Sequence, residues 1–226
     1  MSNRSHVPHV ITDDSSAGGK VINGSLVFNI GRENFLRRTP SSDGNRRTFT
    51  FSCWFKRTRI GGEQRIFSSY NGSSIHNQCG IKFFSNNTFQ VFNSPSGSLS
   101  TNLITNRFFR DTSAWMHIVV AVDTTQGTAA NRVLIYINGE QETSFSTANY
   151  GSQNEDWWFD NNSAQHIGGR GSEQTQYSDM YLTEVHHIDG QALLPSYFGY
   201  TDSSTGIWRP KNIQMAIMVL VVIIYR

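Results

Sequence analysis

The chain has 226 residues, a formal net charge of +2 and an aromatic content of 12%. A chain of this length can form one large all-β domain or two small ones, with a sizeable core. The near-neutral charge, without a long basic run, argues against a nucleic-acid-binding protein, and two cysteines are too few for a disulfide framework.

The N-terminal segment, residues 1–20, is polar and rich in Ser, Asp and Gly. This composition is typical of a flexible arm. The segment contains no apolar core of a signal peptide, so the sequence does not indicate classical secretion.

Short segments in which apolar and polar residues alternate follow one another along most of the chain. The clearest is 48–56, where Phe49, Phe51 and Cys53 share one face while Thr50 and Trp54 lie on the other. No window before residue 210 has a helical period. The expected strands, about a dozen, are 25–29, 34–38, 48–56, 64–70, 79–84, 88–93, 103–109, 115–123, 132–138, 141–146, 165–169 and 177–188.

Residues 115–140 are predicted to form the centre of a sheet. Residues 118–122 are apolar on both faces, as in a strand that is covered on two sides. Residues 132–138 alternate, and Asn138-Gly139 then supplies the positive φ angles of a tight hairpin turn.

These patterns predict an all-β protein with little helix. We expect a two-sheet antiparallel β-sandwich over residues 21–211, with the alternating aromatic side chains between the sheets. One helical turn is expected within 192–200. Cys53 and Cys79 are predicted to be reduced thiols, and His186 and His187 place one imidazole on each face of a strand.

Several motifs occur in the order and spacing of a known family. WMHIVVAVD, RVLIYINGE, HIGG and YLTEVHHIDGQAL resemble the laminin-G-like members of the concanavalin A-like lectin/glucanase superfamily. Similar versions occur in structural proteins of marine tailed bacteriophages, on the segments SLVFN, RTPSSDGNRRTFTFSCWFKR, AWMHIVVAVDTTQ and EVHHIDGQALLPSYFG. The resemblance implies a concanavalin A-like jelly roll and a virion protein that is made in the host cytoplasm.

The C-terminal segment, residues 212–226, departs from this resemblance. The similar proteins continue with a strand rich in Tyr and Gly, whereas this chain is apolar from Met215 to Tyr225. Back-translation with a shift of two bases restores the glycine-rich pattern, so we hypothesise that this tail is a frameshifted last strand. A membrane helix needs roughly 20 apolar residues, so the run is too short for a membrane span.

The sequence does not predict an active site. A glycoside hydrolase needs two carboxyl groups that flank the scissile bond. Glu140 and Glu142 follow a turn, and Glu184 is alone on its strand. No nucleophile-elbow motif is present, so the protein is not expected to be an enzyme.

No cofactor is expected, with calcium as the open alternative. Some laminin-G-like relatives bind calcium through Asp side chains and carbonyl oxygens, and this resemblance makes Asp123, Asp160 and Asp179 candidate ligands.

The loop over residues 147–164 combines aromatic rings with polar side chains. A sugar ring stacks on an aromatic plane while its hydroxyl groups bind Asn and Asp. The alternative is that Trp158 or Phe159 closes the edge of the sandwich. The candidate carbohydrate-binding residues are Tyr150, Asn154, Asp156, Trp157, Trp158, Asp160 and Asn161.

We therefore expect a non-enzymatic carbohydrate-binding or adhesion module of a phage-like virion protein. Its expected partners are a host-surface glycan, other virion proteins and further copies of itself in a homo-oligomer. The first alternative is a purely structural decoration or spacer domain of a tail fibre or capsid. The second is a glucanase-like hydrolase.

Overall fold

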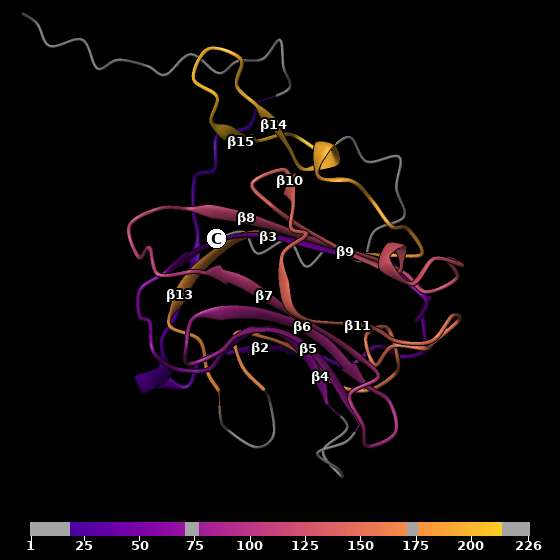
Figure 1. Cartoon of the computed structure of the whole chain (residues 1–226). Helices are drawn as coiled ribbons and strands as arrows, with labels where there is room; N and C mark the ends of the chain where they lie inside the picture. The colour runs from indigo at the N-terminus through magenta and orange to yellow at the C-terminus, as the bar shows by residue number, and fades with distance from the viewer. Residues whose placement is uncertain (1–18, 71–76, 171–175, 214–226) are drawn as a thin grey trace, which may run out of the picture.

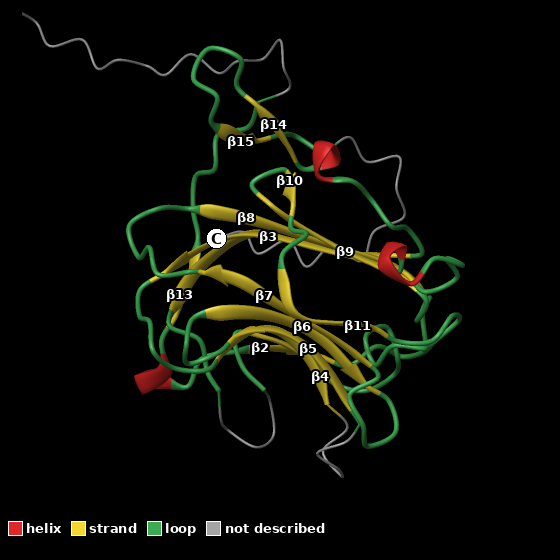
Figure 2. Ribbon diagram, viewed as in Figure 1, coloured by secondary structure: helices red, strands yellow, loops and turns green. Residues whose placement is uncertain are grey.

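The computed structural model describes residues 19–70, 77–170 and 176–213. Two large antiparallel sheets lie face to face, and a small two-stranded sheet lies beyond one of them (Figures 1 and 2). Helix is limited among the described residues to three 3-10 turns, η2 (Ile30–Arg32), η3 (Ala129–Asn131) and η4 (Pro195–Tyr197). The architecture is a jelly-roll β-sandwich, which confirms the two-sheet sandwich predicted from the alternation and the jelly roll implied by the family resemblance.

One large sheet has six strands. It contains the two longest strands among the described residues, which pair over most of their length from Met180↔Arg57 to Asp189↔Phe49. The order across the sheet is β1 (Leu26–Phe28), β13 (Met180–Asp189), β3 (Thr48–Arg57), β8 (Met116–Asp123), β9 (Val133–Ile137) and β10 (Glu140–Gln141).

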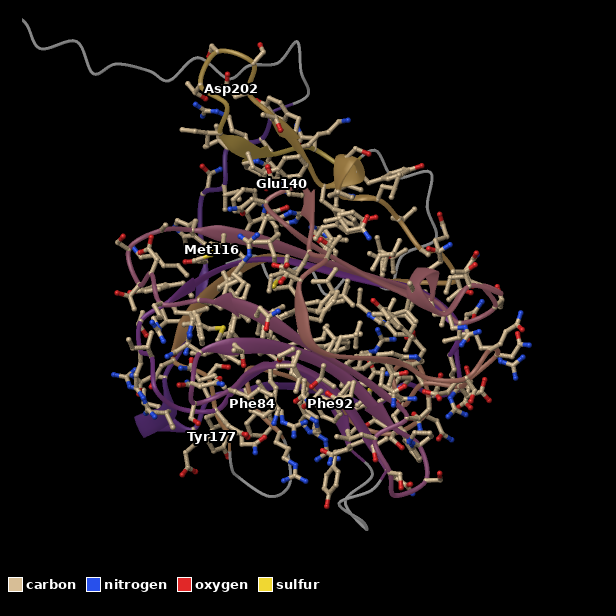
Figure 3. All side chains as sticks on the ribbon, viewed as in Figure 1. Phe84, Phe92, Met116, Glu140, Tyr177 and Asp202 are labelled. Carbon is tan, nitrogen blue, oxygen red and sulfur yellow. The ribbon has the colours of Figure 1, made fainter. Side chains whose placement is uncertain are left out.

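The other large sheet has seven strands. The order across it is β11 (Phe145–Tyr150), β7 (Thr101–Phe108), β6 (Thr88–Ser94), β5 (Gln78–Phe83), β4 (Gln64–Tyr70), β12 (Gln165–Ile167) and β2 (Leu36–Arg38). Figure 3 labels Phe92, from β6, and Phe84, which directly follows β5, on the side of this sheet that faces away from the core.

The core between the sheets is aromatic, as expected. Phe51 from one sheet stacks on Phe67 from the other with ring centroids 4.9 Å apart, and Phe67 stacks on Phe159 at 4.2 Å. Cys53 and Cys79 are buried free thiols, which confirms the prediction of two reduced cysteines. Burial raises the pKa of both thiols, so they stay protonated and behave as small apolar side chains.

The hairpin over 115–140 forms as predicted, with φ of 50° at Asn138 and 84° at Gly139. Its place in the sheet differs from the prediction, because β9 and β10 lie at an edge and the middle of the sheet is β13, β3 and β8.

The prediction of a return strand over residues 141–146 is wrong. Residues 140–141 pair with β9, and the chain then crosses to the edge of the other sheet as β11. Glu142 holds this crossing: its carboxylate accepts hydrogen bonds from the Ser144 backbone N–H and from Arg107 Nε at 2.7 Å.

A third layer covers part of the outer face of the six-stranded sheet. It consists of β14 (Gly199–Thr201) and β15 (Trp208–Pro210), visible above β8 and β9 in Figure 1. Gly19 pairs with Lys211 beside it, and the Lys20 backbone N–H donates to Pro210 O at 3.1 Å. Residues 1–18 of the expected arm and 214–226 of the apolar tail lie outside the described residues. Within the described ranges, no helix is long and apolar enough to cross a membrane.

Candidate functional site

The aromatic loop over 147–164 lies at one end of the sandwich and does not present Trp157 to solvent. The Trp157 side chain is 0% exposed, and its ring lies 5.5 Å from Phe49 and 6.1 Å from Phe159. This corrects the assignment of Trp157 as a stacking surface, because a fully buried ring cannot contact a sugar. The loop instead closes the end of the core. Phe159, which stacks on Phe67, occupies the place there that the alternative interpretation gave it.

The acidic residues of the loop are also committed to contacts within the protein. Asp160 is buried and lies 2.6 Å from His187 Nε2, while Asp156 accepts a hydrogen bond from Arg47 Nε at 2.7 Å. Asn161 is buried, and its side chain accepts from the Ser163 backbone N–H.

The remaining candidates of the loop do not form a binding platform. Tyr150 and Trp158 are half-buried and pack against the core, with the Arg46 guanidinium 5.9 Å from the Trp158 ring centroid. Asn154 is exposed and has a φ of 62°. The conformation of this loop is therefore explained by packing of its aromatic side chains against the core and by ion pairs of its acidic side chains.

The three calcium candidates have separate local partners. Asp123 accepts hydrogen bonds from Thr125 and Gln126 within its own turn, and Asp179 accepts from the Ile30 backbone N–H at 2.8 Å. Asp160 is the partner of His187. Among the described residues, no three His, Cys, Asp or Glu side chains are grouped so that they could hold a metal ion.

The outer face of the seven-stranded sheet carries pairs of cations and aromatic rings. Lys82 Nζ lies 4.3 Å from the Phe84 ring centroid, and the Arg65 guanidinium lies 5.1 Å from that of Phe92. Arg65, Lys82 and Phe92 are nearly fully buried. Their surfaces are therefore covered by contacts within the protein and leave little area for a ligand.

A pair that resembles a nucleophile and its base lies on the outer face of the six-stranded sheet. Ser52 Oγ is 2.8 Å from His117 Nε2. However, the Trp208 indole N–H donates to His117 Nδ1 at 3.1 Å, and an indole nitrogen can only donate. The imidazole proton therefore sits on Nε2 and points at Ser52, so His117 cannot accept the serine proton.

An open groove of about 420 Å³ lies on the outer face of the same sheet. Figure 3 labels Met116, the first residue of β8, which directly follows Trp115. The indigo segment before β1 runs from beside β15 down to the six-stranded sheet in Figure 1. The groove is lined by Ile22, Asn23, Gly24, Ser25, Trp54, Trp115, Thr183 and Pro210.

The floor of the groove is formed by side chains that point outward from the central strands. Trp54 is an outward residue of β3 and pairs across the strands with Thr183 on one side and His117 on the other. Trp115 directly precedes β8, and its ring lies 6.3 Å from that of Tyr181. The outward positions of three adjacent strands thus bring aromatic rings together, because side chains alternate between faces.

Residues 22–25 form a wall of the groove. Thr183 Oγ1 donates a hydrogen bond to Gly24 O at 2.8 Å, and the neighbouring Lys20 forms an ion pair with Glu184. Segment 22–25 is therefore held by β13 at Gly24, and the residues just before it, Gly19 and Lys20, are bonded to the third layer.

Glu184 occupies a bulge in β13 beside Thr183. Its φ is 47°, and the pairing with β3 shifts register between Thr183 and His186. Burial alone would raise the pKa of the Glu184 carboxyl group, but hydrogen bonds from His186 and Lys20 hold it below its ordinary value. A charged carboxylate therefore anchors the wall through Lys20.

The groups in the groove are suited to a sugar. Trp115 is 39% exposed and offers a ring face, whereas Trp54 is largely buried at 7% exposed and contributes only the edge of its side chain that lines the floor. Asn23 and Ser25 are exposed and make no side-chain hydrogen bond to the described part of the chain. A concave site with aromatic walls and a few neutral polar groups can stack a pyranose ring and bind its hydroxyl groups.

The sequence contains one local signal for this groove, the position of Trp54. Trp54 shares the polar face of its strand with Thr50, Ser52 and Lys56. A tryptophan on that face is an outward-pointing aromatic residue in an otherwise polar pattern. Its combination with Trp115 and with residues 22–25 depends on pairing between distant segments, which alternation does not reveal.

Facing antiparallel sheets of six and seven strands define a β-sandwich of the concanavalin A-like type. The family model described as concanavalin A-like lectin/glucanases superfamily (Laminin_G_3) matches residues 31–193, and the chain belongs to this family. No curated protein matches the chain.

Solved structures share the fold at low sequence identity. A native heptameric SAP-like pentraxin from Limulus polyphemus is 17% identical, with 88% of this chain and 87% of that chain covered and a TM-score of 0.51. A putative carbohydrate binding protein from Bacteroides ovatus is 14% identical, with 73% of this chain and 42% of that chain covered and a TM-score of 0.49. At 17% identity the likeness to the pentraxin shows the fold alone.

Proposed function

We propose that this protein is a non-enzymatic carbohydrate-binding module and that its glycan binds in the groove between Trp54, Trp115 and residues 22–25. The observation that carries the proposal is the groove itself. It joins two tryptophan side chains to exposed amide and hydroxyl groups in a space of about 420 Å³, within the range of small-ligand sites.

The composition of the groove favours binding over hydrolysis. Enzymatic glycoside cleavage needs two carboxyl groups about 5–5.5 Å apart for retention, or further apart for inversion. The described lining residues include neither Asp nor Glu. The nearby Ser52–His117 pair has the wrong tautomer for nucleophilic attack. A glucanase-like activity is thus the less favoured alternative.

We further propose a biological setting. The motifs that resemble marine phage structural proteins support an adhesion module of a virion, made in the host cytoplasm and assembled with other virion proteins. In this setting the groove binds a glycan of the host surface. A purely structural spacer domain is the alternative, and it requires no ligand in the groove.

The test is glycan binding by the wild type and by two single-site variants. Trp115→Ala removes an exposed ring from the groove, and Phe108→Ala is the matched control because Phe108 is 52% exposed and lies outside the lining. We expect Trp115→Ala to weaken binding of array glycans about tenfold or more, since a stacked aromatic ring contributes roughly 1–3 kcal/mol, while Phe108→Ala binds normally.

Failure of the wild type to bind any glycan on a broad array would overturn the proposal in favour of the structural alternative. Equal loss in both variants would show that the effect is not specific to the groove. Release of reducing ends from a bound glycan would revive the hydrolase alternative.

A further inference from the structure

One cation stands beside the groove without a carboxylate partner in the described chain. Lys56 lies on the outer face of β3, directly opposite Tyr181 of β13. The β3–β8 pairing ends at Phe55↔Met116, and continuing this register by one residue places Trp115 on the other side of Lys56. Lys56 therefore lies between two aromatic residues, one of which lines the groove.

The two rings converge over this position. Trp115, which directly precedes β8, and Tyr181 of β13 lie on opposite sides of β3, and their ring centroids are nevertheless only 6.3 Å apart. Lys56 is half-buried. Aromatic neighbours cover the aliphatic stem of such a lysine and leave its ammonium group at the surface.

The charges around Lys56 leave its ammonium group available to a ligand. Lys56 makes no salt bridge or hydrogen bond to any of the described residues. Hydrogen bonds from Ser113 and Ala114 lower the pKa of the exposed Asp111 carboxyl group. The positive charge of Lys56 lowers this pKa slightly further. Asp111 does not lie within salt-bridge distance of Lys56, and Glu184 is paired with Lys20 and His186.

From this arrangement we infer that the groove selects acidic saccharides: sugar rings stack on Trp54 and Trp115 while a carboxylate or sulfate group of the same glycan pairs with Lys56. The inference rests on the proposed carbohydrate binding and adds the class of glycan. An ammonium group flanked by rings and partly shielded from water favours an anion more than a fully exposed one does.

The experiment compares matched acidic and neutral probes by calorimetry at low salt. The pairs are an oligogalacturonide and its methyl ester, sialyllactose and lactose, and a sulfated oligosaccharide and its desulfated form. The variants are Lys56→Gln, Lys56→Arg and, as a control that removes an exposed cation outside the groove lining, Arg110→Gln. Thermal unfolding of each variant checks that the fold is intact.

We expect the acidic member of at least one pair to bind about fivefold or more tightly than its neutral partner. Lys56→Gln should remove this preference and change the affinity for the neutral probe less than about twofold, while Lys56→Arg and Arg110→Gln keep the preference. The pair that shows the preference identifies carboxylate or sulfate as the preferred group.

Equal binding of acidic and neutral members in every pair, or a preference that survives Lys56→Gln, would overturn the inference and leave the proposed carbohydrate binding intact. Absence of binding to all six probes and to array glycans would instead overturn the proposed function. The two failures are therefore distinguishable.

Discussion

At the scale of single residues, His117 illustrates how hydrogen bonding decides the role of a side chain. Its two ring nitrogens are engaged by Trp208 and Ser52, and the ring is 1% exposed. Burial, with a smaller contribution from the charge of His186, lowers its pKa to about 3. The imidazole is thus neutral in the folded protein at any pH near neutrality, and it acts as a fixed part of the sheet surface.

This neutrality predicts how stability depends on pH. Between the ordinary histidine pKa near 6.5 and about 3, the unfolded chain binds a proton at His117 that the folded protein does not, so stability falls as the pH falls. One such imidazole accounts for about 2 kcal/mol between pH 6.5 and pH 5. We expect chemical unfolding to show that His117→Gln loses less stability than the wild type over this interval. Equal losses would contradict the account.

Trp157 provides a second prediction at this scale. Because its ring fills the end of the core, Trp157→Ala is expected to cost roughly 3–5 kcal/mol of unfolding free energy. Trp157→Phe should retain the fold and normal glycan affinity, measured on the folded fraction. If Trp157→Phe abolished glycan binding without loss of stability, the loop over 147–164 would be the site after all.

At the scale of elements, the third layer is joined to the sandwich through Trp208. A Cβ atom at Gly139, in the β9–β10 turn, would lie 2.4 Å from the Trp208 ring, and one at Gly199 would meet the same ring. Trp208 also stacks on His117 at 6.0 Å. The indole is thus enclosed between the hairpin turn and β14.

A pair of glycine substitutions separates this contact from backbone strain. Gly139 and Gly190 have similar φ angles of 84° and 79°, but only Gly139 contacts Trp208. Gly190→Ala is expected to cost about 1–2 kcal/mol for the positive φ. Gly139→Ala should cost about 1–3 kcal/mol more, for displacement of the ring. Equal costs in chemical denaturation would show that Trp208 is not tightly held.

The elements also show what the sequence could predict. Alternation located most strands to within two residues, and Asn138-Gly139 predicted its turn, since both depend on local preferences. The crossing after Gln141 and the β14–β15 pair were missed, because they depend on side-chain bonds and on pairing between segments distant in sequence. For the same reason Trp157 was wrongly predicted to be a stacking surface, since its burial follows from tertiary packing.

At the scale of the whole molecule, the groove combines two parts of the chain. Its floor, Trp54, Trp115 and Thr183, lies within residues 31–193, which the family model matches. Its wall, residues 22–25 and Pro210, lies outside that range. The groove is therefore formed by segments that flank the matched range and lie on the outer face of the sandwich, which explains why neither the fold nor a local motif indicated it.

The most direct test of this account is an NMR titration that follows the indole N–H signals of the five tryptophans, assigned through single Trp→Phe variants, as a glycan found by array screening is added. The account predicts that the signals of Trp54 and Trp115 shift in proportion to occupancy while those of Trp157 and Trp158 stay in place. Shifts confined to Trp158, with Trp54 and Trp115 unchanged, would contradict it and return the site to the loop at the end of the sandwich.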